Sequence, residues 1–197
     1  MRRSAKEFED YFSHLQQTSF AGRVYKRLFL SPVLYLCARR FGKRVIEIGS
    51  GAGTGLLGAF PRRVQGLEIN PLAVEYCKAA GLNVQLIGDD GAFPVADGAF
   101  DACVLDNVLE HIDDPRQTLD ECHRITGTNG GLIIAVPGIR GYELDGDHRK
   151  FYDERALRHL DNRWSLQSLF STPFLFTFEN LSKAVKQYCL VATYKRV

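Results

Sequence analysis

The sequence predicts a doubly wound α/β fold, in which helices cover both faces of a mostly parallel sheet. Short apolar runs alternate with segments whose apolar residues recur at helical spacing. The first of these runs, residues 44–48, continues directly into the glycine-rich turn of residues 49–55 and then into an apolar helix start. Such alternation favours parallel strands joined by right-handed crossovers, with a ligand site where the glycine turn meets the sheet edge.

The expected elements follow in chain order. Residues 5–41 predict two or more helices ahead of the sheet, which we expect to cap the ligand cleft. The expected strands are residues 44–48, 64–69, 83–87, 102–105, 132–136, 166–170 and 188–193. The expected helices after the first strand are residues 53–60, 71–80, 115–126 and 153–160.

Two of these helices have clear terminal signals. Asn70 is placed to cap the second helix after the first strand, and Gly81 suits the end of that helix because glycine readily adopts positive φ. Asp114 and Gln117 have the spacing of a capping box at the start of the next helix.

Composition places the chain among globular proteins with a single core. The chain has 197 residues, of which 45% are hydrophobic and 24% charged. No apolar run approaches the roughly 18 residues that span a bilayer, and no apolar segment typical of a secretory signal follows the first residues. The five cysteines are widely spaced and odd in number, which predicts buried free thiols in a reducing cytoplasm and no zinc site. We expect no metal site elsewhere.

Charge is distributed unevenly along the chain. Residues 1–44 hold ten Lys or Arg and three Asp or Glu, whereas residues 85–121 hold one basic and ten acidic residues. The acidic stretch favours a cationic ligand group over a pyrophosphate. The basic amino-terminal stretch fits a solvated helix face, a phosphate-bearing ligand or peripheral contact with a membrane surface, and these alternatives stay open.

The glycine turn departs from the dinucleotide-binding fingerprint. G-x-G-x-x-G frames that start at Gly49 and Gly51 place Thr54 and Leu56 at the sixth position, which disfavours a nicotinamide oxidoreductase. Glu68 ends the next apolar run, 19 residues past Gly49. A carboxylate at this place suits both hydroxyls of a ribose. The pattern therefore predicts a bound adenosine ribose, whatever the rest of the cofactor.

Five motifs between residues 44 and about 138 together resemble the class I S-adenosylmethionine-dependent methyltransferases, of the small-molecule type 11 family. The first two are the glycine turn and Glu68. The other three follow in the family's order. They are residues 88–101 (GDDGAFPVADGAFD), residues 106–115 (DNVLEHIDDP), and residues 124–125 with 130–137 (RI and GGLIIAVP).

The resemblance implies a Rossmann-like seven-stranded sheet with one antiparallel strand, and S-adenosyl-L-methionine as the cofactor. The glycine turn would bind the methionine part, Glu68 the ribose, and Asp89 the adenine amino group. Glu47 either contacts the methionine amine or orders the glycine turn, and the second role is favoured. The implied cofactor-binding residues are Glu47, Gly49, Ser50, Gly51, Gly53, Glu68, Ile69, Asp89, Asp90, Asp106 and Asn107.

Two histidines are candidates for a general base. Transfer of a methyl group from a sulfonium leaves a neutral sulfide, so positioning and desolvation supply most of the acceleration. A hydroxyl acceptor would also profit from a base. His111 lies in the Leu-Glu-His motif and has helix capping as its alternative role. His148 lies in a stretch that loosely resembles the family's D-H-x-R-F-Y sequence on the substrate side.

The predicted function is methyl transfer to a small-molecule acceptor, such as a sugar, a lipid-linked compound or another metabolite. We expect one domain, with a helical cap (1–43), a cofactor-binding core (44–138) and a substrate side (139–197). The alternative is a non-catalytic S-adenosylmethionine-binding subunit or an activator of a partner protein. No nucleic-acid methyltransferase signature is evident, so a nucleic-acid partner is not expected. The acceptor, the general base and the oligomeric state stay open.

Overall fold

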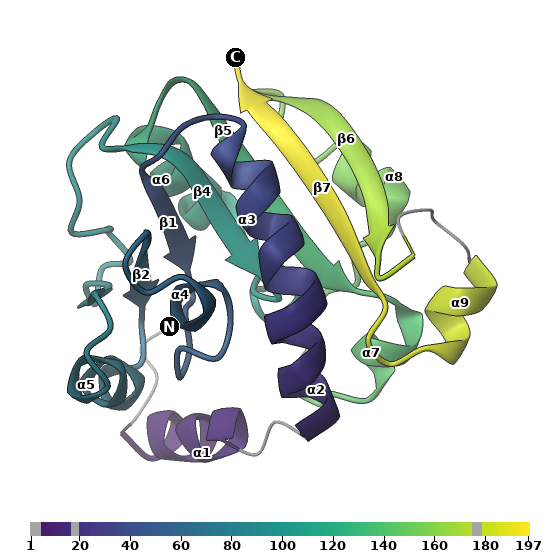
Figure 1. The fold of residues 1–197 in the computed structure, drawn as a ribbon, viewed down its shortest axis with the longest axis horizontal. Coiled ribbons are helices and arrows are strands. Elements are labelled where there is room, and N and C mark those ends of the chain that lie inside the picture. Colours follow the sequence, from purple (N-terminus) through teal and green to yellow (C-terminus); the bar gives the residue numbers. More distant parts are fainter. Residues whose placement is uncertain (1–4, 17–19, 175–178) are drawn as a thin grey trace.

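The computed structural model describes residues 5–16, 20–174 and 179–197, and these residues form a seven-stranded sheet (Figure 1). The strand order is β3-β2-β1-β4-β5-β7-β6. Neighbours from β3 to β5 are parallel, and β7 runs antiparallel to both β5 and β6. The expected mixed sheet with its antiparallel seventh strand is thereby confirmed. The strands are β1 Val45–Ile48, β2 Val64–Glu68, β3 Val84–Leu86, β4 Phe100–Asp106, β5 Thr126–Pro137, β6 Trp164–Thr172 and β7 Cys189–Arg196.

Helices cover both faces of this sheet. A helical run formed by α2, η1 and α3 crosses one face, while α6 and α8 lie on the other (Figure 1). Among the described residues, no helix is both long and apolar enough to cross a membrane. The α-helices are α1 Ala5–Gln16, α2 Phe20–Tyr25, α3 Ser31–Arg39, α4 Leu56–Ala59, α5 Pro71–Ala79, α6 Arg116–Ile125, α7 Ile139–Glu143, α8 Glu154–Arg158 and α9 Glu179–Ala184. The shorter turns are η1 Lys26–Leu30, a π-helix, and η2 Leu109–His111, a 3-10 helix.

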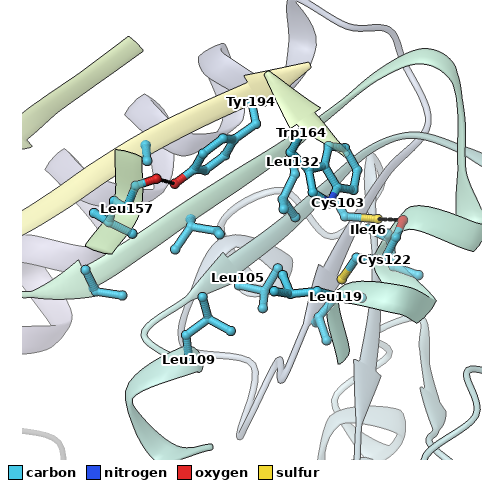
Figure 2. Close-up of a cluster of buried hydrophobic side chains, with 14 of the residues drawn as sticks. Ile46, Cys103, Leu105, Leu109, Leu119, Cys122, Leu132, Leu157, Trp164 and Tyr194 are labelled. Carbon is cyan, nitrogen blue, oxygen red and sulfur yellow. Dashed lines mark hydrogen bonds between the residues drawn. The ribbon is translucent and has the colours of Figure 1, made fainter. Parts of the chain in front are cut away.

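The core consists of two apolar clusters, one on each face of the sheet. Successive strand residues point to opposite faces, so neighbours along a strand enter different clusters. Val45 and Val104 join the cluster that contains the side chains of α3 and α4. Ile46 and Leu105 join the cluster that contains those of α6 and α8 (Figure 2). The near-continuous apolar sequence of β1 and β4 reflects this burial on both faces.

Two polar side-chain atoms inside the cluster on the α6 and α8 side contact carbonyl groups of those helices. The Tyr194 hydroxyl of β7 donates to the Leu157 carbonyl of α8 at 2.7 Å, which ties the helix to the antiparallel edge (Figure 2). The Cys103 thiol lies 3.8 Å from the Cys122 carbonyl of α6. All five cysteines are free and buried, as expected from their spacing.

The amino-terminal helices lie over the carboxyl ends of the central strands. In Figure 1, α1 lies beyond the arrowheads of β1 and β4 and below α5. The Asn70 side-chain amide donates to the Phe8 carbonyl at 2.9 Å, and Phe12 packs edge-on against Tyr76 of α5. These contacts hold α1 at the edge where ligands of such sheets bind.

Some element boundaries differ from the expected ones. The helix expected over residues 53–60 begins only at Leu56, because the backbone at Gly53 has φ of +70° and cannot be helical. The capping box expected at α6 is wrong. Asp114 accepts from the Arg116 amide at 3.2 Å, but the Gln117 side chain donates to the Asp90 carbonyl instead. Strands β6 and β7 exceed their expected lengths because their antiparallel pairing continues past the apolar runs. Strand β5 begins earlier than expected, at Thr126, which pairs with Phe100 of β4.

The caps predicted for α5 are confirmed. The Asn70 side chain accepts from the Leu72 amide at 3.0 Å, and Gly81 adopts φ of +75° after the helix. Helices α7 and α9 were not expected. Each has six residues or fewer, which is too short for a helical pattern to stand out in the sequence.

We predict that Asn70→Ala lowers the free energy of unfolding by about 1 to 2 kcal/mol, because the substitution removes the cap of α5 and the contact to α1 together. Urea unfolding of wild type and variant measures the difference. The exposed Asn83→Ala is the matched control, and an equal effect of both substitutions would contradict the role of the cap.

Candidate functional site

A cavity of about 430 Å³ opens at the carboxyl ends of β1 and β4, beneath the amino-terminal helices. Its walls come from α1, α2, the glycine turn, η2, the loop after α7 and the start of β7. Eight of the predicted site residues line it: Glu47, Gly49, Ser50, Gly51, Asp106, Asn107, His111 and His148. A larger cavity of about 770 Å³ lies at the amino ends of the strands and contains none of the predicted residues.

Glu47 orders the glycine turn from inside β1. Its side chain is 2% exposed, and its two carboxylate oxygens accept from the Leu56 and Leu57 amides at 3.0 and 2.7 Å. These amides are the first free donors of α4, so the carboxylate caps that short helix. These bonds hold the start of α4, which follows the glycine turn, and Glu47 also lines the cavity. The role of Glu47 toward a cofactor stays a prediction.

The glycine turn brings backbone close to the cavity. Gly49 adopts φ of +70°, and a Cβ at this position would lie 2.7 Å from a methyl group of Val108. Gly51 also has positive φ. The Ser50 hydroxyl is buried and has no hydrogen-bond partner among the described residues. A buried hydroxyl is rarely left unpaired, so this one is suited to a polar ligand atom.

Glu68 lies behind the glycine turn and not on the cavity wall. It is 3% exposed, and its oxygens accept from the amides of Gly51 at 2.7 Å and of Ile69 and Asn70 at 2.9 Å each. The carboxylate therefore fixes the glycine turn to the end of β2. Oε1 accepts the bonds from Ile69 and Asn70, and Oε2 accepts the bond from Gly51.

Asp106 forms an ion pair that the sequence did not predict. The ammonium of Lys26, from η1, lies 3.2 Å from Asp106 Oδ2, and the side-chain amide of Asn107 donates to Oδ1 at 2.6 Å. Asn107 itself adopts φ of 55°, an uncommon conformation that turns the chain out of β4. The amino-terminal helices thus contribute a cation to the cavity as well as part of its wall.

Burial shifts the pKa values of the charged groups in and beside the cavity. Burial, reinforced by the negative charge of Asp106, raises the pKa of Glu47 to about 8. Burial likewise raises the pKa of Glu110 to about 8. Burial alone would lower the pKa of Lys26, but the carboxylates of Asp106 and Glu47 outweigh it and raise that pKa. The cavity thus favours added positive charge.

The two candidate catalytic histidines come together, although they are far apart in the sequence. The rings of His111 and His148 lie 4.7 Å apart, centre to centre, and Tyr142 stacks on His148 at 5.2 Å. The Arg149 and Lys150 amides donate to the Glu110 carbonyl at 2.7 and 3.1 Å, which holds the loop after α7 against η2. Burial and the neighbouring His148 lower the pKa of His111.

Four predicted residues lie near the cavity but outside its wall. Gly53 packs against Leu82 and Cys77, Ile69 is 46% exposed after β2, and Asp89 lies in the exposed turn after β3. Asp90 accepts from the Ala92 amide at 3.0 Å within that turn. All four lie at the carboxyl ends of strands or in the glycine turn, on the same edge of the sheet as the cavity.

Several cavity residues were missed by the sequence analysis. Tyr11, Tyr25 and Lys26 come from helices whose docking cannot be read from a local pattern, and Cys189 comes from the far end of the chain. Glu110 stood inside a quoted motif, but its burial beside His148 depends on a long-range contact that the sequence does not show.

Comparison with known proteins places this geometry in context. Residues 46–134 match the family described as "Methyltransferase domain". The chain is 32% identical over 117 residues to a probable S-adenosylmethionine-dependent methyltransferase of Mycolicibacterium smegmatis, covering 58% of this chain and 42% of that protein. It is 30% identical over 133 residues to the demethylmenaquinone methyltransferase of Renibacterium salmoninarum, covering 63% of this chain and 54% of that protein.

A solved structure shares the fold over nearly the full length. It is the complex between the Haloferax volcanii Trm112 methyltransferase activator and the putative methyltransferase, with a TM-score of 0.71 and 17% identity over 96% of this chain and 97% of that one. The chain spans about half the length of the curated relatives it matches.

We predict that Glu47 makes the protein less stable as pH rises from about 4.5 to about 8. Because the folded-state pKa lies above the unfolded value, the folded state holds the extra proton in this window and loses that advantage as the proton leaves. Glu47→Gln removes the titration. The free energy of unfolding of the variant minus that of wild type should therefore increase by about a few kcal/mol from pH 5 to pH 8. Urea unfolding at both pH values measures this, and a pH-independent difference between the two proteins would refute it.

Proposed function

We propose, on the premise that residues 46–134 form a class I S-adenosylmethionine-dependent methyltransferase domain, that this chain transfers a methyl group from S-adenosyl-L-methionine to a small-molecule acceptor. The observation that carries the proposal is the cavity at the carboxyl ends of β1 and β4, which is lined by the glycine turn and by two buried acidic residues, Glu47 and Asp106. Its volume, about 430 Å³, is in the range of small-molecule sites.

The residues present fit the cofactor. The Ser50 hydroxyl and the backbone of the glycine turn suit the carboxylate of the methionine part, because that turn exposes N–H groups and has no Cβ at Gly49 and Gly51. Glu47 and Asp106 suit its ammonium and the sulfonium. Glu68, Ile69, Asp89 and Asp90 extend along the same sheet edge in the order that ribose and adenine require.

Charge compensation determines how the methionine part binds. Lys26 holds the position beside Asp106 that a cationic cofactor group would share. The ammonium on its flexible side chain can move aside, whereas the carboxylates at the strand ends cannot. We expect cofactor binding to move the Lys26 side chain, and we expect Glu47 to keep its hydrogen bonds to the amides of α4.

The reaction is an in-line displacement at the methyl carbon. A lone pair on the acceptor forms the new bond to carbon, and the electrons of the carbon–sulfur bond return to sulfur as neutral sulfide. The chain's contribution is to position the acceptor and exclude water under α1 and α2. His111 and His148 line the acceptor side of this cavity and are placed to take a proton from a hydroxyl or amine.

A metabolite is the favoured acceptor class. The relative from Renibacterium salmoninarum is named for a small molecule, demethylmenaquinone, and residues of α1 and α2 form part of the wall of this chain's cavity. A sugar or a lipid-linked compound fits the same description. The second candidate function is a subunit that binds the cofactor without turnover. This alternative is considered because one fold neighbour was solved in complex with a methyltransferase activator.

We predict that S-adenosylhomocysteine binds wild type in calorimetric titration and that Glu68→Ala weakens binding at least about tenfold, through loss of the ribose acceptor and of the turn that Glu68 holds. The exposed Glu75→Ala on the neighbouring helix is the control and should bind as wild type does. Thermal unfolding of each variant checks that the fold is intact. Equal affinity of Glu68→Ala and Glu75→Ala in folded protein would overturn the cofactor assignment.

Turnover separates the two candidate functions. S-adenosylmethionine labelled in its methyl group is incubated with the protein and a metabolite extract, which is then divided into small-molecule and macromolecular fractions. Label in the small-molecule fraction supports the proposed transferase. Tight cofactor binding without label in either fraction would favour the binding subunit.

A further inference from the structure

We propose that Glu110, His111 and His148 form a binding site for a divalent transition-metal ion on the acceptor side of the cavity. One ligand-type atom from each residue lies within 4.8 Å of the other two. Glu110 and His111 belong to η2 after β4, and His148 lies in the loop after α7. The composition of the cluster, two imidazoles and one carboxylate, is a common ligand set for such ions.

Glu110 has the strongest need for a cation. Its residue is 1% exposed, and neither carboxylate oxygen has a hydrogen-bond partner among the described residues. His148 Nε2 lies 3.9 Å from Glu110 Oε1, which is too far for a hydrogen bond. A carboxylate in this position costs several kcal/mol unless it is neutralised, and Lys26 is engaged by Asp106. A bound metal ion would supply the missing charge.

Both histidines are oriented as metal ligands are. Nδ1 of His148 lies 2.9 Å from the Tyr142 carbonyl, and Nδ1 of His111 lies 3.3 Å from the Asp147 carbonyl. A carbonyl can only accept, so these contacts place the ring proton on Nδ1 and leave the lone pair on Nε2. Fixing the tautomer through a backbone carbonyl is the usual outer-shell arrangement of a metal-binding histidine.

Backbone hydrogen bonds hold the two parts of the cluster together. The Arg149 and Lys150 amides donate to the Glu110 carbonyl, so the backbone that bears His148 is bonded to the backbone that bears Glu110. Bonds of about 2.1 Å to a shared ion allow ligand atoms to lie up to about 4.2 Å apart. The distance of 3.9 Å between His148 and Glu110 is within that limit, and the widest separation of 4.8 Å needs a contraction of about half an ångström.

The three ligand groups determine which metal ions the site prefers and which acceptor group could bind at the open position. Imidazole nitrogens favour Zn²⁺, Co²⁺, Fe²⁺ or Mn²⁺ over Mg²⁺ and Ca²⁺, which prefer oxygen. Three protein ligands leave at least one coordination position open, and His111 and His148 both line the cavity. With the ion bound, the Nε2 lone pairs of His111 and His148 are engaged, so these histidines act as ligands and not as the general base. The open position suits an acceptor with a hydroxyl or carboxylate oxygen. This substrate class rests on the proposed methyl transfer, whereas the metal site does not.

Metal binding can be measured with the ion alone. Chelator-treated wild type is titrated with Zn²⁺ by calorimetry, and with Co²⁺ by its visible absorption. We expect one site per chain, with affinity at least about 100-fold weaker in Glu110→Gln and in His148→Ala, since loss even of outer-shell groups costs 10- to 100-fold. His159→Ala, which removes an exposed imidazole outside the cluster, is the matched control and should bind as wild type does.

Thermal unfolding with and without Zn²⁺ shows whether a variant that fails to bind the ion is still folded. Zn²⁺ should raise the Tm of wild type and of His159→Ala, and leave the Tm of the cluster variants unchanged. Glu110→Gln should fold without metal, because its amide carries no buried charge. Absence of stoichiometric binding to wild type, or binding that Glu110→Gln and His148→Ala leave intact, would overturn the proposal. If S-adenosylhomocysteine still binds in that case, only the metal site has failed and the proposed function stands.

Discussion

Compensation of buried carboxylates at one edge of the sheet is the constraint on which the rest of the site depends. Glu47 and Asp106 lie at the ends of adjacent parallel strands and are almost fully buried. A buried carboxylate needs hydrogen bonds or a cation. Glu47 obtains two amides of α4, and Asp106 obtains Lys26 and Asn107. The glycine turn, the short helix and the amino-terminal helices are therefore coupled to the same pair of charges.

This coupling links the cap to the chemistry proposed for the cavity. Lys26 belongs to the helical run that crosses one face of the sheet, and Tyr11 of α1 lies edge-on to His111 at 6.3 Å. Any cationic ligand that enters must share Asp106 with Lys26, so ligand binding and the placement of the amino-terminal helices depend on each other. The domain division proposed from the sequence, with residues 1–43 as a cap, is consistent with that dependence.

The sequence predicted the parts of the molecule that local patterns encode. The apolar runs located all seven strands, and Asn70 and Gly81 located the ends of α5, because backbone sterics and capping act over a few residues. It did not predict the pairing of Lys26 with Asp106, since that contact depends on how η1 packs. Nor did it predict that Glu110 and His148 lie close together, because they meet only when the loop after α7 bonds to η2. Long-range contacts between loops leave no periodic signal.

The most direct test of the central claim is the proton balance of S-adenosylhomocysteine binding. Calorimetric titration at about pH 7.5, in two buffers of different ionisation enthalpy, measures protons released per ligand bound. If the ligand's ammonium binds beside the buried carboxylates, it favours their ionised form. Wild type should then release protons, and Glu47→Gln should release fewer. Failure of wild type to bind, or identical proton release by both proteins, would contradict the account.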